Sequence, residues 1–214
     1  MSPLNIAMEN YTARFITAEE IHYIKEIFKV DNTAQRQEMS PEQINRFLLQ
    51  TQKGLEMGKA ICSTTFDGGG KPIGMYVAWK MPMNAGWQMG LTKMVEKHAH
   101  YSTSADVLVL GLDLILEAME AEGFYKFWIN SSEKHLNIRN NLMFKKSKLF
   151  ARYKWFDENI IPAGQDSSVE MFNFFRSKVN WTDIVVRMYV LDQPYRIEHL
   201  KKHNSKDYIG VEQR

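Results

Sequence analysis

The sequence predicts a single α/β domain in which helices flank a mixed central sheet. Three observations predict this class. Apolar residues recur at helical intervals in two segments before residue 58, a glycine-rich turn joins two β-like runs near residue 70, and a long apolar helix precedes further strands. The chain of 214 residues contains no internal repeat or low-complexity linker and is long enough to bury one sizeable core.

Two amphipathic helices are expected in the first part of the chain. Thr17 and Glu20 have the spacing of a capping box at the start of the first helix, and apolar residues follow at helical intervals. Ser40 is expected to cap the second helix, with Gln43 reaching back to the cap. Gly58 can end this helix in a left-handed conformation.

A β-hairpin is the clearest signal in the next part of the chain. The runs KAICSTTF and IGMYVAW have β-like composition, and the connection DGGGKP between them is typical of a hairpin turn. Residues 82–104 mix methionine, glycine and aromatic residues without one clean period. No element is therefore assigned to residues 82–104.

A long, mostly buried helix is expected over residues 105–123, with Thr103 and Asp106 at capping-box spacing and Gly123 as its stop. The first half of this segment also alternates like a strand, but its length and its LEAMEAE ending favour a helix. The elements expected after it are a strand at 124–129, a helix at about 133–146, a strand at 149–156, a short helix at 168–175 and a strand at 183–191.

Composition and charge limit the classes of function. The chain has 27 basic and 25 acidic residues, a net charge of +2, which argues against a protein directed wholly at polyanions. Its single cysteine, Cys62, lies in an apolar run and is expected to be a buried structural thiol. No apolar run reaches the ~18 residues that span a bilayer, and the start lacks the pattern of a signal peptide. We therefore expect a cytoplasmic protein.

The order of these elements resembles the GNAT acyltransferase fold over about residues 12–192. That family often carries Asn, two residues, Ala, two residues and Leu-Tyr in its second half. Asn137 stands at the Asn of this pattern and Met143–Phe144 at the Leu-Tyr. The resemblance implies a single GNAT-like acyl-CoA N-acyltransferase domain at residues 1–192. The polar composition of the end of the chain predicts a surface arm at residues 193–214.

The resemblance also implies a cofactor, acetyl-CoA. In the family, acyl-CoA binds where two parallel strands splay apart, and its pyrophosphate lies against backbone N–H groups at the start of the long helix. The residues expected to bind the cofactor here are Ser102, Thr103, Ser104, Ala105, Asn137 and Phe144. The family's loop has glycines at this place and HAHYSTSAD has none, so a simple helix cap is the alternative interpretation of the segment.

Candidate catalytic residues lie just before the long helix. Glu96 or His100 would take the proton of the acceptor amine. The family's general acid is a tyrosine, but Phe144 stands at that position and has no proton to give; Tyr153 and Tyr125 are the alternative donors. His98 and His100 would share a strand face and suit a metal pair, but no third ligand is evident, so no metal is predicted.

Residues 134–154 contain seven positive residues and no carboxylate. This basic stretch has three interpretations: a solvated helix face, a site that contacts the CoA 3′-phosphate, or a surface that binds nucleic acid through phosphate contacts and base stacking. The alternation in FARYKWF more simply predicts a sheet strand, with Phe150, Arg152 and Lys154 on one face and Tyr153 and Trp155 on the other. Nucleic-acid binding is therefore not expected.

Two functions remain open. One is an acyl-CoA-dependent N-acetyltransferase, or a diverged derivative, whose amine acceptor the sequence does not identify. The other is a catalytically silent GNAT-like assembly protein, similar to those that tailed phages encode, which would bind protein partners in the host cytoplasm or the virion. The missing glycines and Phe144 favour this second function.

Overall fold

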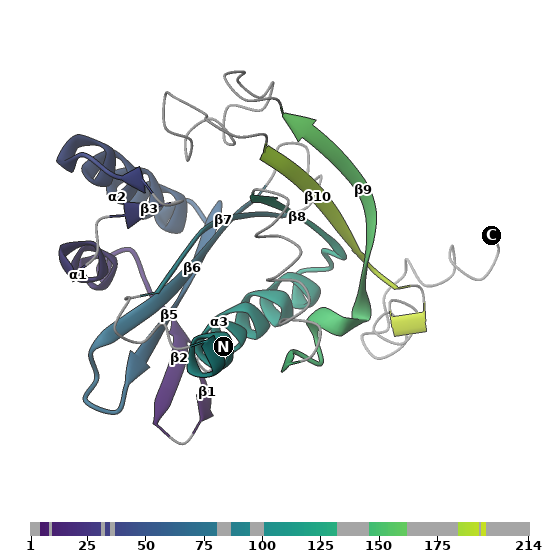
Figure 1. The fold of residues 1–214 in the computed structure, drawn as a ribbon, viewed down its shortest axis with the longest axis horizontal. Coiled ribbons are helices and arrows are strands. Elements are labelled where there is room, and N and C mark those ends of the chain that lie inside the picture. The colour runs from purple at the N-terminus through teal and green to yellow at the C-terminus, as the bar shows by residue number, and fades with distance from the viewer. Residues whose placement is uncertain are drawn as a thin grey trace.

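An eight-stranded sheet forms the centre of the protein (Figure 1). The computed structural model describes residues 5–8, 10–30, 33–34, 37–80, 87–94, 101–131, 146–161, 184–192 and 194–195. The strand order is β1-β2-β5-β6-β7-β8-β10-β9. The strands are β1 (Asn5–Met8), β2 (Tyr11–Phe15), β5 (Ala60–Asp67), β6 (Pro72–Lys80), β7 (Trp87–Met94), β8 (Lys126–Ser131), β9 (Tyr153–Ile161) and β10 (Ile184–Leu191).

Helices cover both faces of this sheet (Figure 1). The helices α1 (His22–Val30) and α2 (Pro41–Glu56) lie on one side of β5 and β6, and α3 (Tyr101–Ala121) lies on the other. The short strands β3 (Thr33–Ala34) and β4 (Gln37–Glu38) pair between α1 and α2 in sequence. Alternate residues of β6 therefore enter different cores: Met75 and Val77 pack with α1 and α2, whereas Tyr76 and Ala78 pack with α3.

The predicted helix ends are largely confirmed. Ser40 accepts the Gln43 N–H at 3.3 Å, and the Gln43 side chain accepts the Ser40 N–H at 2.8 Å, so both halves of the capping box form. Gly58 has a φ of +63° and Gly123 a φ of +79°. Each glycine lies in the left-handed region that ends a helix. Glu20 accepts the Thr17 N–H at 3.1 Å, although α1 itself begins only at His22.

Helix α3 approaches the sheet most closely at Gly111. The Ser63 hydroxyl on β5 donates to the Gly111 carbonyl oxygen at 2.9 Å. A Cβ atom at residue 111 would lie 2.9 Å from the Ser63 hydroxyl oxygen and 3.0 Å from the Tyr76 ring. The absence of a side chain at Gly111 therefore permits this packing distance.

Several sequence-based expectations are corrected. The sequence patterns do not predict the strands β1 and β2, and β7 lies within residues 82–104, to which they assign no element. Helix α3 begins at Tyr101, so Thr103 lies in its first turn and is not its cap. Residues Phe150–Arg152 form a 3₁₀ turn before β9, and Phe150 and Tyr153 consequently enter the same core, against the predicted alternation.

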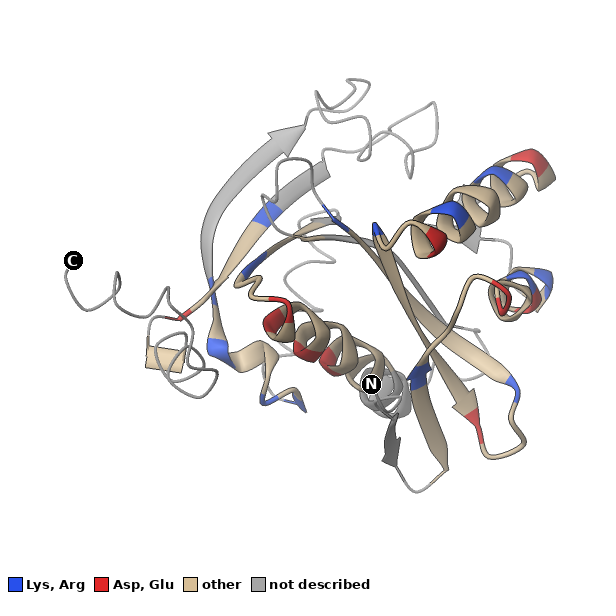
Figure 2. Cartoon of the chain, turned by 180° about the vertical axis from the view of Figure 1, so that it is seen from behind, with Lys and Arg blue, Asp and Glu red and all other residues tan. Residues whose placement is uncertain are grey.

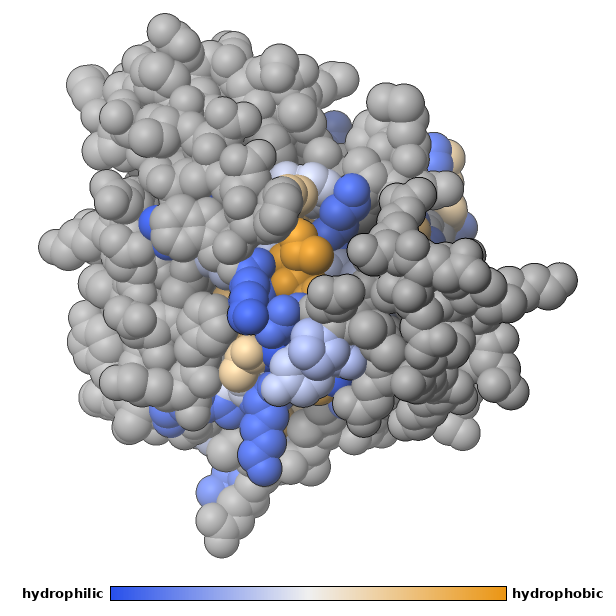
Figure 3. Space-filling view, turned by 90° about the vertical axis from the view of Figure 1, so that its right-hand side faces the viewer, coloured by the Kyte–Doolittle hydropathy of each residue, from blue (hydrophilic) through white to orange (hydrophobic). Residues whose placement is uncertain are grey.

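Other expectations fall outside the described residues: most of the helix at 133–146, the helix at 168–175 and nearly all of the arm at 193–214. The hairpin and the strands β8 and β10 are confirmed. Among the described residues, no helix combines the length and apolarity needed to span a bilayer. On the side of the molecule shown in Figure 3, the described surface is mostly hydrophilic around one small apolar patch.

Candidate functional site

Among the described strands, β7 and β8 form the one parallel pair, and helix α3 connects them. Their pairing covers Trp87 with Phe127, Gln88 with Trp128 and Met89 with Ile129. Beyond Met89, β7 continues to Met94 and stays paired with β6. Beyond Ile129, β8 continues to Ser131 and stays paired with β10. The two parallel strands therefore part at their carboxyl ends, as the resemblance implied.

A β-bulge lies at the point where these strands part. In the β6–β7 ladder, Tyr76 pairs with Thr92 and Ala78 pairs with Met89. Val77 therefore faces two residues of β7, Gly90 and Leu91. A bulge bends its strand and increases the local twist, and glycine is frequent at such positions. The bend gives a physical reason for β7 to leave β8 after Met89.

The N-terminus of α3 lies at the same edge of the sheet. Only residues 95–100 separate the end of β7 from Tyr101. The backbone N–H groups of a first helical turn have no partner inside the helix and carry the positive end of its dipole. Ligands of sheets with parallel strands bind outside the carboxyl ends of those strands. This edge therefore offers unpaired strand backbone beside a group of donors suited to an anion.

The structure brings together only some of the residues predicted for the site. Ser102, Thr103 and Ser104 lie in the first turn of α3 and Ala105 begins the second, so their backbone is at this edge. Five candidate residues lie outside the described residues. They are the predicted catalytic residues Glu96 and His100, the neighbouring His98, and the predicted cofactor-binding residues Asn137 and Phe144.

Neither alternative tyrosine is placed as a proton donor at this edge. The Tyr153 side chain is fully buried and its hydroxyl donates to Glu120 at 3.0 Å. Burial, reinforced by the Glu120 charge, raises the pKa of Tyr153. Tyr125 precedes β8 and therefore lies at its amino end, opposite the edge where the strands part.

Sequence reasoning missed a polar network between α3 and the segment 147–153, called here the Ser147 turn. Three carboxylates form an acidic face on α3: Asp113, Glu117 and Glu120. Their spacing of four and three residues places them on one side of the helix. Figure 2 shows acidic residues along the side of α3 nearest to this turn, which carries basic residues. The helical spacing of the three acids was the available signal in the sequence.

The Ser147 turn contacts the acidic face at two places. The Ser147 hydroxyl donates to the Asp113 carboxylate and accepts the Phe150 N–H at 2.8 Å. Arg152 donates through Nη2 to both Glu120 oxygens, at 2.6 and 2.8 Å. Tyr153 donates to the same Glu120 carboxylate. The α3 carboxylates thus neutralise part of the positive charge that the sequence concentrates in residues 134–154.

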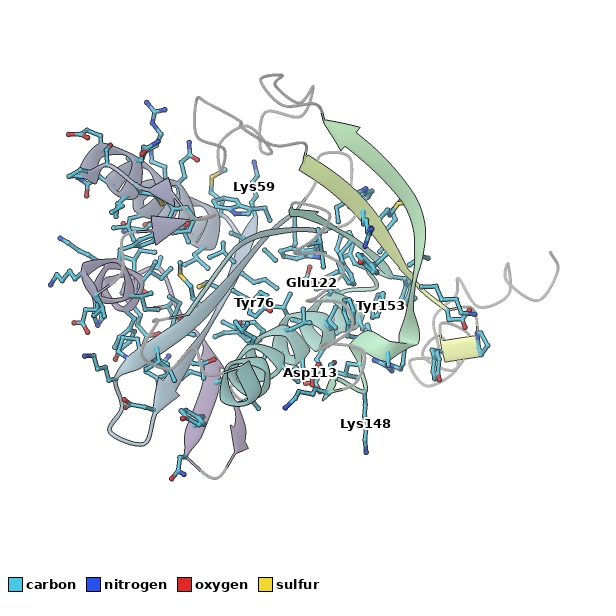
Figure 4. All side chains as sticks on the ribbon, in the orientation of Figure 1. Lys59, Tyr76, Asp113, Glu122, Lys148 and Tyr153 are labelled. Atoms are coloured by element: carbon cyan, nitrogen blue, oxygen red, sulfur yellow. The ribbon has the colours of Figure 1, made fainter. Side chains whose placement is uncertain are left out.

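The remaining described basic residues of that stretch lie nearer to solvent. Lys154 forms an ion pair with Asp192 at 2.6 Å, and its side chain is 73% exposed. In Figure 4, Lys148 projects away from the domain, whereas Tyr153 lies on the inner side of β9. In the described part of the basic stretch, Lys148 and Lys154 are therefore exposed to solvent, and Arg152 is paired with α3.

Removal of the charge at Asp113 is expected to change how stability depends on pH. Burial raises the pKa of Asp113 above its usual range, despite the Ser147 hydrogen bond and nearby Arg152. A raised carboxyl pKa means that the folded state binds the proton more tightly, so this group costs stability as the pH rises above about 4. We expect Asp113→Asn, which keeps an acceptor for Ser147, to stabilise the protein at pH 8 more than at about pH 3.5, below the unfolded pKa of an aspartate. Urea denaturation at both pH values measures the difference, and an equal effect at both would contradict it.

Cys62 is fully buried, as predicted for a structural thiol. Burial raises the pKa of Cys62 to about 12, so the nucleophilic thiolate form is strongly disfavoured. Among the described residues, no three histidine, cysteine or carboxylate side chains gather as metal ligands.

Comparison with known proteins relates this arrangement to acetyltransferases. No protein-family model and no curated protein sequence matches the chain. Among solved structures, the ribosomal-protein-S5-alanine acetyltransferase from Vibrio fischeri aligns with a TM-score of 0.60 at 11% identity, over 89% of this chain and 98% of that one. A ribosomal L7/L12 alpha-N-protein acetyltransferase in complex with coenzyme A aligns with a TM-score of 0.59 at 10% identity, over 88% and 99%.

A spermidine N-acetyltransferase chimera from Vibrio cholerae and hSSAT aligns with a TM-score of 0.56 at 11% identity, over 89% of this chain and 98% of that one. These similarities extend over most of each chain. The protein therefore has the GNAT fold, as the order of its elements predicted.

Proposed function

We propose that the protein is an acyl-CoA-dependent N-acyltransferase that transfers an acetyl group from acetyl-CoA to an amine. The observation that carries this proposal is the parting of β7 from β8 after Met89, next to the bulge at Gly90 and Leu91 and the N-terminus of α3. The likeness to acetyltransferase structures supports the same activity.

The backbone at this edge fits the chemistry of acyl-CoA. An extended chain with amide groups can pair with the strand backbone that β7 and β8 leave unpaired. A pyrophosphate can accept hydrogen bonds from the first turn of α3, where Ser102, Thr103 and Ser104 add hydroxyl groups. Asn137 and Phe144 complete the proposed cofactor-binding set, as the resemblance implied.

Acetyl-CoA supplies an acetyl group as a thioester. Its transfer breaks the C–S bond and forms a C–N amide bond, while the amine loses a proton and the released sulfur gains one to leave as a thiol. The chain's own contribution is to orient the reactants and to move the proton. Glu96 and His100 lie in the connection between β7 and α3 and are the proposed bases for the amine proton. Bulged residues leave ladder donors free, so the backbone N–H groups of Gly90 and Leu91 are candidates to stabilise developing negative charge on a carbonyl oxygen.

We propose a protein N-terminal α-amine or a polyamine as the acceptor. The similar structures include acetyltransferases named for ribosomal proteins and for spermidine, which supports both classes. Because the reaction needs only a neutral amine held beside the thioester, proximity supplies much of the rate. The bases are then required chiefly to remove the amine proton.

Calorimetry and thermal denaturation with acetyl-CoA test the proposed cofactor. We expect binding heat and, at a free concentration 100 times the Kd, a stabilisation of about 2.7 kcal/mol. ATP is the matched control, because it carries phosphates but no acylated thiol. Mass spectrometry of an α-amino peptide and of spermidine after incubation then tests transfer. Absence of binding heat and of a thermal shift at millimolar acetyl-CoA would overturn the proposal.

The second candidate, a GNAT-fold assembly module without catalysis, is favoured by two features of the sequence. The connection before α3 and its first turn contain no glycine, and Phe144 stands where the family carries a tyrosine. This candidate requires a stable protein partner or self-association, which light scattering after size-exclusion chromatography measures. A monomer that acetylates an amine would exclude it.

A further inference from the structure

We propose that Arg187 of β10 stabilises the negative charge that forms on the sulfur of CoA when the thioester is broken. This inference rests on the proposed function and adds a catalytic residue to it. The observation that carries it is a buried arginine that strand register places beside the last residue pair joining β7 to β8.

A row of four residues crosses the sheet at the point where β7 and β8 part. Ala78 of β6 pairs with Met89 of β7, which in turn pairs with Ile129 of β8. Ile129 pairs on its other side with Arg187 of β10. Neighbouring strands lie about 4.8 Å apart, so the Cα atoms of Met89 and Arg187 are separated by roughly 10 Å. Figure 1 shows β7, β8 and β10 side by side in this order. Arg187 is therefore one strand away from the opening between β7 and β8.

Arg187 lies on the face of the sheet that α3 covers. Along β10, alternate residues are buried, namely Arg187, Tyr189 and Leu191. Tyr189 and Leu191 belong to the core cluster that contains the apolar residues of α3. Because successive side chains of a strand point to opposite faces, Arg187 shares this face with them. The helix whose N-terminus is the proposed site of the pyrophosphate covers the same face.

A charge at this position costs stability. Arg187 is 4% exposed, and its buried neighbours in the row, Ala78 and Ile129, are apolar. An apolar residue would fill the position at a lower desolvation cost, and residues that break such local rules are expected at functional sites. Arg187 interacts with the protein around it. A guanidinium carries five N–H donors, so it can keep such a contact and still donate to a second acceptor.

The order of groups in acyl-CoA brings the thioester near this row. With the pyrophosphate at the first turn of α3, the extended amide chain runs between β7 and β8 towards the Met89–Ile129 pair, where the strands are still joined. The thioester at the end of that chain lies nearest to this pair. Arg187 is the charged residue of the row and therefore faces the reacting end of the cofactor.

The proposed step requires a cation but no proton from Arg187. When the amine nitrogen attacks the carbonyl carbon, the C–S bond breaks and its electron pair moves to sulfur. Arg187 donates hydrogen bonds to the resulting thiolate and offsets its charge. A guanidinium does not give up its proton in proteins, so the sulfur gains its proton from water as it is released.

Free CoA tests this contact without turnover. A free thiol has a pKa of about 8.5, and a neighbouring cation lowers the pKa of a bound thiol. CoA should therefore bind more tightly as the pH rises. Acetyl-CoA is the matched ligand, because it has no ionisable thiol. The ratio of the two affinities isolates the thiol from protein groups that titrate in both complexes.

The protein groups concerned lie on the elements packed around the row. Glu158 of β9 stands opposite Arg187 in register. The described titratable residues of α3 and of the buried face of β9 and β10 are Asp113, Glu117, Glu120, Tyr153 and Tyr189. They are present in the complexes with both ligands, so their titration does not by itself change the ratio.

We expect the wild-type affinity for CoA, relative to acetyl-CoA, to rise about fivefold or more between pH 6.5 and pH 9, measured by calorimetry. Arg187→Met removes the charge and keeps an unbranched side chain. It should abolish this rise and lower kcat about 100-fold, with KM for acetyl-CoA changed less than about threefold. Arg187→Lys keeps the charge and should retain part of both effects.

Arg152→Met is the matched control. It also removes a partly buried arginine, but the partner of Arg152 is Glu120, near the carboxyl end of α3 and away from the proposed site. This variant should keep the wild-type affinity ratio and kcat, even if its melting temperature falls.

The outcomes are distinguishable. A wild-type protein that does not bind acetyl-CoA overturns the proposed function, and this inference with it. If acetyl-CoA binds but the wild-type ratio is the same at both pH values, the role of Arg187 alone is overturned, and this result needs no variant. A pH-dependent ratio that persists in folded Arg187→Met also overturns it, because another group would then stabilise the thiolate. Arg187→Gln takes the place of Arg187→Met if the latter does not fold.

Discussion

Glu120→Ala is expected to lower the free energy of unfolding by about 2–4 kcal/mol, through loss of hydrogen bonds to buried and charged groups. Glu120 is 5% exposed, and its carboxylate accepts from Arg152 and from the Tyr153 hydroxyl. Its removal leaves the phenol buried without an acceptor. Arg152 would also lose its partner, and its Nε already lies buried without a hydrogen bond. Urea denaturation near neutral pH measures the change.

Glu117→Ala provides the matched control on the same face of α3. Burial and repulsion from Asp113 and Glu120 raise the pKa of Glu117, so its charged form is disfavoured in the folded protein. Removal of this carboxylate should be neutral or stabilising at neutral pH. Tyr153→Phe should cost about 1 kcal/mol, since it removes one hydrogen bond without removing the carboxylate. The explanation fails if Glu117→Ala destabilises as much as Glu120→Ala.

The elements that could be predicted from the sequence are those whose signals are local. The Ser40–Gln43 capping box involves residues three apart, and the turn DGGGKP joins adjacent strands. In that turn, the Asp67 side chain accepts the N–H groups of Gly69 and Lys71 at 3.0 and 2.9 Å. Such contacts depend on residue types at fixed short spacings, so they are visible without tertiary structure.

Strand β7 escaped prediction for a physical reason. Its bulge places both Gly90 and Leu91 opposite Val77, which interrupts the two-residue alternation by which a strand is identified. The same irregularity lies where β7 leaves β8. The feature that hid the strand in the sequence is therefore the feature that opens the candidate site.

The polar network at α3 could not be predicted because its partners are distant in the sequence. Ser147 lies 34 residues from Asp113, and Arg152 lies 32 residues from Glu120. Viewed along the chain, the basic residues of 134–154 have no nearby carboxylate. The counter-charge of Arg152, Glu120, lies on an earlier helix that the fold brings alongside, and that of Lys154, Asp192, lies after β10. A count of charges within residues 134–154 alone therefore overestimates the positive charge of this segment in the folded protein.

Deletion of Gly90 is expected to weaken acetyl-CoA binding by tenfold or more while the domain remains folded, if the proposed cofactor is correct. One residue fewer in β7 would let Val77 face a single residue, so the β6–β7 ladder could run without a bulge. A straighter β7 would follow β8 beyond the Met89–Ile129 pair and close the edge where the strands part. Tenfold corresponds to about 1.4 kcal/mol of binding free energy, measured here by calorimetry.

Two controls separate loss of the bulge from a general effect of the change. Gly90→Ala keeps the number of residues in β7 and should bind acetyl-CoA with nearly wild-type affinity. Deletion of Gly69, which is exposed in the β5–β6 turn, shortens the chain by one residue away from the site and should leave the Kd unchanged. Melting temperatures of all three variants monitor the fold. If the protein lacking Gly90 is folded and binds acetyl-CoA as tightly as the wild type, the bulge does not open the site.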